Sequence, residues 1–160
     1  MHTENTVYIH GPVSRIFELA ANIQAWPSLL PHYREVIVFE QSDDGQRKVV
    51  EMAAVREDFP LPGLPFPVRW RSVQVCERKT GHIYFKHMAG MAKGMWVVWS
   101  LDEDEWGRGV RVTIRHDLTY PFPLLNGWFA QDLVGQQFVG AIAGRTLAVI
   151  KAIVEKEAGQ

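Results

Sequence analysis

Residues 12–40 read PVSRIFELAANIQAWPSLLPHYREVIVFE, and this stretch decides the fold. Pro12 suits the first turn of a helix, where its missing N–H costs little. A helix is predicted after it because apolar residues recur at helical spacing, namely Ile16, Phe17, Leu19, Ala20 and Ile23. The residue before a proline is pushed away from helical angles, so we expect a break at Trp26-Pro27.

A second apolar patch follows this break. It consists of Leu29, Leu30 and Tyr33, and the alternating run after it predicts a strand over about residues 34–41. A first strand is predicted before the helices, over about residues 6–10. The stretch therefore predicts two short helices between the first two strands, an uncommon arrangement that narrows the choice of fold.

The rest of the chain predicts more strands and one long helix. Ser42-Asp43-Asp44-Gly45 indicates a hairpin turn, because Asp-Gly readily supplies positive φ angles. Further strands are predicted over about 46–57, 68–77, 82–88, 94–101 and 110–120. Short connections imply antiparallel neighbours, and the Pro-rich loop at 60–67 cannot join a central ladder. From about 127 to 157, an apolar stripe predicts a C-terminal helix.

Three glycines interrupt this predicted helix, at positions 135, 140 and 144. A glycine costs about 1 kcal/mol relative to alanine in a helix interior. We favour close approach of the helix to the sheet as the reason for them, and the alternative is that they leave room for a ligand beneath the helix. One helix cannot fill a strongly curved sheet that has one apolar face, so a cavity between the two is expected.

Bulk composition limits the classes of function. A chain of 160 residues fits a single α+β domain, and a net charge of −1 with no basic stripe argues against nucleic acid as a partner. The single cysteine fits a reducing compartment. The first residues lack the apolar core of a signal peptide, and no apolar run approaches the length of an integral membrane segment. We therefore expect a cytoplasmic protein.

Several catalytic signatures are missing from the sequence. The six histidines show no zinc spacing, and one cysteine adds nothing to them. No Gly-rich phosphate loop follows a predicted strand, and no serine occupies a nucleophile elbow. We therefore expect no metal, nucleotide or other cofactor. The six Trp and eight Phe residues either fill the core or line a large apolar space.

The order of elements and the motif AxNIQAWPSLLPHYREVxVxE, at residues 20–40, resemble the START/Bet v 1-like (SRPBCC) superfamily. Within it, the similarity is greatest to the polyketide cyclase/dehydrase group, which includes aromatase/cyclases. A looser similarity lies near Val75-Cys76-Glu77-Arg78. The ubiquinone-binding branch of the superfamily shares a segment similar to residues 20–40. The resemblance implies a helix-grip fold, in which a curved antiparallel sheet of about seven strands wraps around a long C-terminal helix.

The resemblance also implies a deep apolar cavity that holds a lipid, a polyketide, a quinone or another hydrophobic molecule. Aromatase/cyclases of this group fold a poly-β-keto chain there and steer its aldol closure and dehydration. Tyr33 and Arg78 stand where such enzymes carry a cavity tyrosine and a cavity arginine. Ser72 and Gln74 replace two tryptophans that precede the arginine in the enzymes, and Trp70 lies two residues upstream.

Strand alternation predicts which side chains point inward. His116 falls on the apolar face of its strand, where it either moves protons near neutral pH or is a buried histidine with a fixed hydrogen bond. Arg56 shares a face with Met52, and it either holds an anionic oxygen in the cavity or reaches water, which we favour. Trp70 is expected to point inward, because its neighbours Arg69 and Arg71 suit solvent better.

For two further groups of apolar side chains, the sequence leaves the position relative to the cavity open. Trp96 and Trp99 cannot share a face of a regular strand, so one lines the cavity and the other backs the sheet or the loops. In the Pro-rich loop, Phe59, Leu64 and Phe66 either form part of an entrance lid or pack over the mouth without gating it.

We predict a domain that binds a hydrophobic small molecule, with catalysis as an open question. The predicted lining or rim consists of Trp26, Met52, Arg56, Trp70, Trp99 and Tyr120. If the protein is an enzyme, it is an aromatase/cyclase or dehydratase for a polyketide-like substrate. His116 or Tyr33 would then move protons, and Arg78 or Arg56 would hold an oxyanion. The alternatives are a quinone- or lipid-binding accessory protein without catalysis and an interaction module with a filled cavity.

Overall fold

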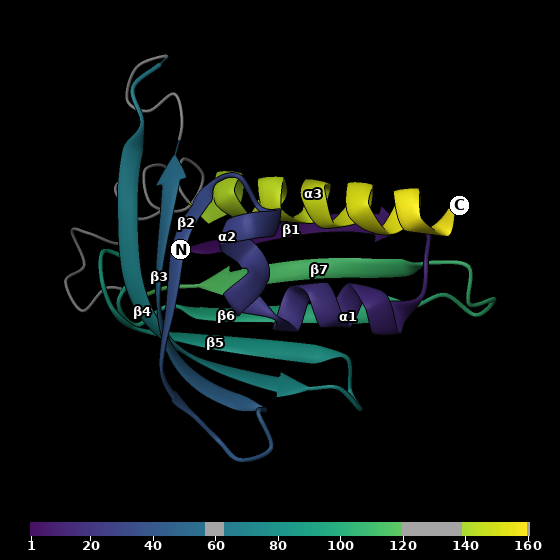
Figure 1. The fold of residues 1–160 in the computed structure, drawn as a ribbon, viewed down its shortest axis with the longest axis horizontal. Helices are drawn as coiled ribbons and strands as arrows, with labels where there is room; N and C mark the ends of the chain where they lie inside the picture. Colours follow the sequence, from purple (N-terminus) through teal and green to yellow (C-terminus); the bar gives the residue numbers. More distant parts are fainter. Residues whose placement is uncertain (57–62, 120–138, 160) are drawn as a thin grey trace.

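The computed structural model describes residues 1–56, 63–119 and 139–159, and Figure 1 shows one curved sheet with helices on its inner side. The strands are β1 (His2–Ile9), β2 (Tyr33–Gln41), β3 (Arg47–Arg56), β4 (Phe66–Glu77), β5 (His82–Ala89), β6 (Trp96–Glu103) and β7 (Val110–Asp117). The helices are α1 (Val13–Ala21), the 3₁₀ turn η1 (Ile23–Ala25), α2 (Trp26–Leu29) and α3 (Ala141–Ala158). This order confirms the predicted helix-grip arrangement.

The seven strands form one antiparallel sheet in the order β1-β7-β6-β5-β4-β3-β2. In Figure 1, β2, β3 and β4 turn away from the direction of β1, β6 and β7, so the sheet is strongly bent. Helix α3 packs along β1, and α1 lies against α3. Register shifts between β2 and β3 and between β4 and β5 accompany the bend, as bulges locally increase strand twist.

The break between the short helices differs from the prediction. Trp26 has helical angles, φ −57° and ψ −39°, and Pro27 lies in the first turn of α2. The chain leaves helical geometry earlier, at Asn22, where φ is −84° and ψ is 65°. The restriction that proline imposes on its preceding residue is a preference, and here the packing of buried Trp26 overrides it. Pro12 is the N-cap of α1 rather than a residue of its first turn.

The described part of the C-terminal helix agrees with its predicted apolar stripe. Its buried residues are Ala143, Thr146, Leu147, Ile150 and Val154. The predicted helix start near residue 127 and Gly135 lie outside the described residues. A Cβ added to Gly144 would lie 3.4 Å from Asn5 Nδ2 of β1, so this glycine faces the first strand. A Cβ added to Gly11 would overlap Val154, so the turn before α1 lies tightly against α3.

Candidate functional site

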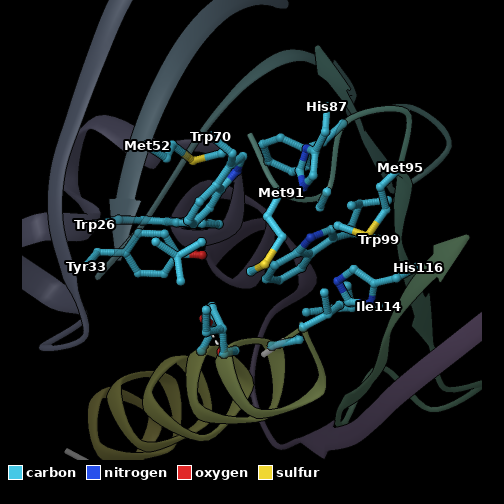
Figure 2. Close-up of a pocket in the computed structure, with 18 residues that line it drawn as sticks. Trp26, Tyr33, Met52, Trp70, His87, Met91, Met95, Trp99, Ile114 and His116 are labelled. Atoms are coloured by element: carbon cyan, nitrogen blue, oxygen red, sulfur yellow. Dashed lines mark hydrogen bonds between the residues drawn. The ribbon is translucent and has the colours of Figure 1, made fainter. Parts of the chain in front are cut away.

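A cavity of about 90 Å³ lies between the inner face of the sheet and the N-terminal part of α3. Figure 2 shows its lining, which is dominated by aromatic and thioether side chains. No charged side chain lines it among the described residues. The larger lining residues are Trp26, Tyr33, Met52, Trp70, Phe85, His87, Met91, Met95, Trp99, Ile114 and His116. A space of this composition favours an apolar guest over an ion.

Strand register brings these side chains together from distant parts of the sequence. Met52 of β3 is directly opposite Trp70 of β4, and Trp99 of β6 is opposite Ile114 of β7. Cross-strand partners on one face have their Cβ atoms only about 5 Å apart. Trp70 and Trp99 are both buried, so Trp70 points inward as predicted, and Trp99 is the inward member of the Trp96/Trp99 pair. Trp96 is 51% exposed, and its ring lies 4.4 Å from Lys86 Nζ on the outside.

Trp26 of α2 and Tyr33, the first residue of β2, close one wall of the cavity. Their ring centroids are 4.8 Å apart in an edge-on arrangement, and the Trp26 centroid is 6.0 Å from that of Trp99. Trp26 Nε1 donates a hydrogen bond of 2.9 Å to the carbonyl oxygen of Leu19. Trp26 is therefore held in place by the preceding helix α1, and its apolar ring is presented to the cavity.

The phenol of Tyr33 is buried next to α3. Burial raises the pKa of this phenol well above its ordinary value, and a hydrogen bond with Thr146 opposes part of the rise. The Thr146 hydroxyl donates to the carbonyl oxygen of Ile142 over 2.8 Å and lies 2.9 Å from His32 Nε2. At neutral pH the Tyr33 phenol is protonated, and it belongs to a hydrogen-bonded cluster with Thr146 and His32 next to α3.

His116 lies at the end of β7, buried and in the lining as predicted. Its Nδ1 is 3.3 Å from the hydroxyl of Thr3, its direct partner on β1. Burial lowers the pKa of His116 to about 4, although nearby Asp117 opposes this shift, and His2 adds to it. The imidazole is therefore neutral at pH 7.

A second histidine of the cavity lining, His87, is also buried and was not singled out from the sequence. It lies on β5 directly opposite Ser72 of β4, and the Ser72 hydroxyl is 2.6 Å from His87 Nδ1. Burial lowers the pKa of His87 to about 3, with smaller contributions from His116 and Lys86. The sequence held one signal that His87 is buried. It lies two residues after Phe85 on the same strand, so the two side chains point to the same face.

The turn between β5 and β6 supplies the remaining thioether side chains. Met91, Ala92 and Met95 of this turn line the cavity. The turn approaches β4 closely, because a Cβ added to Gly90 would lie 2.6 Å from the Arg69 carbonyl oxygen. From the sequence, the Pro-rich loop was expected either to form part of an entrance lid or to pack over the mouth of the cavity. Leu64 and Phe66 of that loop are exposed and do not line the cavity, and Phe59 lies outside the described residues.

Comparison with known families decides the assignment. The family model described as polyketide cyclase/dehydrase and lipid transport matches residues 9–139. The chain belongs to the polyketide cyclase/dehydrase and lipid transport family. None of the curated proteins with which the sequence was compared matches it significantly.

Solved structures agree with this fold. The di-domain ARO/CYC StfQ of the steffimycin biosynthetic pathway is 20% identical, with a TM-score of 0.78 over 99% of this chain and 52% of that one. The Zhui aromatase/cyclase from Streptomyces sp. R1128 is 15% identical, with a TM-score of 0.76 over 99% and 95%. A START superfamily protein from Mycobacterium smegmatis is 12% identical, with a TM-score of 0.72 over 97% of each chain. At these identities the likeness concerns the fold alone.

Arg78, which the family resemblance placed in the cavity, lies elsewhere in this member. It follows the end of β4, is exposed, and has its guanidinium carbon 4.8 Å from the centre of the Phe17 ring. It lines a separate surface hollow of about 470 Å³ together with Lys48 and Cys76. Trp70 and Arg78 are eight residues apart, which is about 26 Å along an extended strand, so Arg78, just beyond the end of β4, lies far from Trp70.

The other predicted site residues differ in whether they line the cavity. Tyr33, Trp26, Met52, Trp70, Trp99 and His116 all line the cavity. Arg56, the last residue of β3, is half-buried and is not part of the lining. Tyr120 lies outside the described residues.

The described ranges also contain no group of three or more side chains that could hold a metal ion. Within the same ranges, no helix has the length and apolar character needed to cross a membrane.

Proposed function

We propose that this protein binds a hydrophobic small molecule, such as a lipid, a polyketide or a quinone-like compound, in the cavity between the sheet and α3. The observation that carries the proposal is an interior space lined by Trp, Tyr, Phe and Met side chains without a charged group among the described residues. Membership of a polyketide cyclase/dehydrase and lipid transport family supports it. The aromatase/cyclase names of StfQ and Zhui and the START name of the mycobacterial protein are consistent with it.

The cavity volume adds a requirement to this proposal. The space measures about 90 Å³, whereas pockets for drug-sized molecules usually measure about 300–1,000 Å³. The ligand must therefore displace side chains. Met52, Met91 and Met95 are suited to this, because methionine is unbranched and adapts its shape to irregular partners.

The electrostatics of the lining favour binding over chemistry. A general acid or base works best with a pKa near the operating pH, and the pKa values of His87 and His116 lie near 3 and 4. No cationic side chain of the described residues lines the cavity to hold a developing oxyanion, since Arg78 lines the separate hollow. We therefore favour a carrier or accessory protein. Tyr33 and His116 stay the candidates for proton transfer if turnover of a polyketide-like substrate is found.

A cavity-filling substitution tests the binding proposal. Ala143 is buried on α3 and lines the cavity, whereas Ala148 on the same helix is exposed. The purified protein should carry an apolar compound that native mass spectrometry detects, and after delipidation it should enhance the fluorescence of the neutral probe N-phenyl-1-naphthylamine. Ala143→Phe should abolish the enhancement and Ala148→Phe should retain it. Absence of both the bound compound and probe binding in the unsubstituted protein would refute the proposal.

Turnover is tested separately from binding. Tyr33→Phe and His116→Phe keep apolar side chains in the lining, so both should still bind the probe. If the protein is an enzyme, one of them should lose turnover of a polyketide-like substrate while binding is retained. Unchanged turnover in both variants would exclude these two residues from the chemistry.

A further inference from the structure

One end of the cavity carries a pair of hydrogen-bond donors that the apolar lining does not satisfy. Trp70 is 9% exposed, and its Nε1 has no hydrogen-bond partner among the described residues. An indole N–H is a donor only, and leaving such a group buried and unpaired is unfavourable. In Figure 2 this nitrogen lies on the side of the ring that faces His87. The two ring centroids are 6.0 Å apart.

The Ser72–His87 contact determines which imidazole nitrogen carries the proton. Ser72 is completely buried, and within the described ranges its hydroxyl has one hydrogen-bond partner, His87 Nδ1 at 2.6 Å. A buried hydroxyl proton needs an acceptor, so Ser72 donates to Nδ1. The single proton of the neutral imidazole is then on Nε2. His87 therefore adds a second N–H donor at the cavity, next to that of Trp70.

We infer that the cavity binds its ligand through a neutral carbonyl oxygen, which accepts hydrogen bonds from Trp70 Nε1 and His87 Nε2. This inference rests on the proposed binding function. A carbonyl oxygen has two lone pairs and so can accept both hydrogen bonds. Ketones, quinones and esters supply such an oxygen within an otherwise apolar molecule.

The same surroundings exclude an anionic headgroup. Burial of a carboxylate or phosphate is unfavourable unless a positive charge or several strong donors compensate it. The described lining has no Lys or Arg, and its histidines are neutral at pH 7. The pair thus selects a neutral oxygen and distinguishes a carbonyl compound from a plain hydrocarbon of the same shape.

Three naphthalenes of similar size test this selection in the purified, delipidated protein. They are 2-acetylnaphthalene, a neutral ketone; 2-ethylnaphthalene, which lacks the oxygen; and 2-naphthoate, an anion. Displacement of N-phenyl-1-naphthylamine gives the three dissociation constants. We expect the ketone to bind about tenfold more tightly than the hydrocarbon, as one or two hydrogen bonds would provide. The carboxylate should bind more weakly than both, and the ketone C=O infrared band should shift to lower frequency on binding.

Substitutions at the two donors give the decisive comparison. Trp70→Phe keeps an aromatic ring but removes the N–H, so the preference for ketone over hydrocarbon should fall toward one while hydrocarbon binding persists. His87→Phe should have a similar effect. Trp96→Phe is the matched control, because the Trp96 ring is exposed on the outer face of β6 and does not line the cavity, and it should leave the preference unchanged.

The possible outcomes separate this inference from the binding proposal. If the ketone and the hydrocarbon bind equally to the unsubstituted protein, or if the carboxylate matches the ketone, the carbonyl inference is wrong and the binding proposal stands. If none of the three compounds nor the displacement probe binds, the binding proposal itself fails, and the carbonyl inference with it. The infrared shift in the unsubstituted protein provides a test that needs no variant to fold.

Discussion

Two of the buried histidines, His87 and His116, should make the protein markedly less stable between pH 7 and pH 5. Burial lowers the pKa of His87 to about 3 and that of His116 to about 4, from an ordinary value of 6.5. Below pH 6.5 the unfolded chain takes up protons that the folded chain does not, so the free energy of unfolding falls as the pH falls. The loss levels off only below the folded pKa values.

The magnitude follows from the proton difference. Each pH unit with one extra proton on the unfolded chain is worth about 1.4 kcal/mol, so the interval from 6.5 to 5 corresponds to about 2 kcal/mol per histidine. The two histidines together should therefore contribute a loss of about 4 kcal/mol, a large fraction of the roughly 5–15 kcal/mol that stabilises a typical domain. Carboxyl groups of the unfolded chain titrate mainly below pH 5, and they add little to this interval.

Urea denaturation at pH 7 and pH 5, followed by tryptophan fluorescence and circular dichroism, measures the effect. His87→Gln and His116→Gln remove the titrating groups but retain hydrogen-bonding capacity, so each variant should lose about 2 kcal/mol less than the unsubstituted protein between the two pH values. His10→Gln, at an exposed position, is the control and should not alter the loss. Identical pH dependence in all four proteins would refute the conclusion that burial keeps the two imidazoles neutral.

Two further predictions concern the cavity walls. Trp99→Ala should reduce the free energy of unfolding by about 3–5 kcal/mol because it enlarges a space inside the core, whereas Trp96→Ala on the exposed face of the same strand should cost less than about 1 kcal/mol; equal losses in urea denaturation would contradict the assigned faces. Gly90→Ala should cost about 2 kcal/mol or more, because φ is +95° and the new Cβ would lie 2.6 Å from a backbone oxygen. Gly63→Ala, with φ +77° and no atom of the described residues within 4 Å of the new Cβ, is its control and should cost less.

Alternation within single strands predicted much of the cavity. The inward faces of Met52, Trp70 and His116 followed from the polar or apolar character of their immediate neighbours, and the structure has these residues in the lining. The reason is local: successive side chains of a strand point to opposite faces, so one exposed arginine determines where its neighbours point. The pattern of residues 12–40 likewise predicted the two short helices, the second of which carries Trp26, and the strand that follows them.

Alternation alone could not determine which inward positions share one cavity. Arg78 has the parity of Trp70, yet β4 ends at Glu77, and the arginine lies over Phe17 at the far end of the strand. His87 was overlooked because its importance comes from Ser72, its partner across the β4–β5 pair. That pairing depends on the register shift between Arg71 and Ser72, which no pattern in one strand reveals.

The sequence by itself determined the order of the elements, the faces of most strands and the apolar character of the interior, because these depend on residues near one another in the chain. Only the tertiary structure decided that the rings of Trp70 and His87 lie 6.0 Å apart in the cavity lining and that Arg78 lies over Phe17, outside that lining. These relations depend on strand register and on the bending of the sheet, which arise from contacts between distant segments. The chemical selectivity proposed for the cavity therefore depends on the tertiary fold.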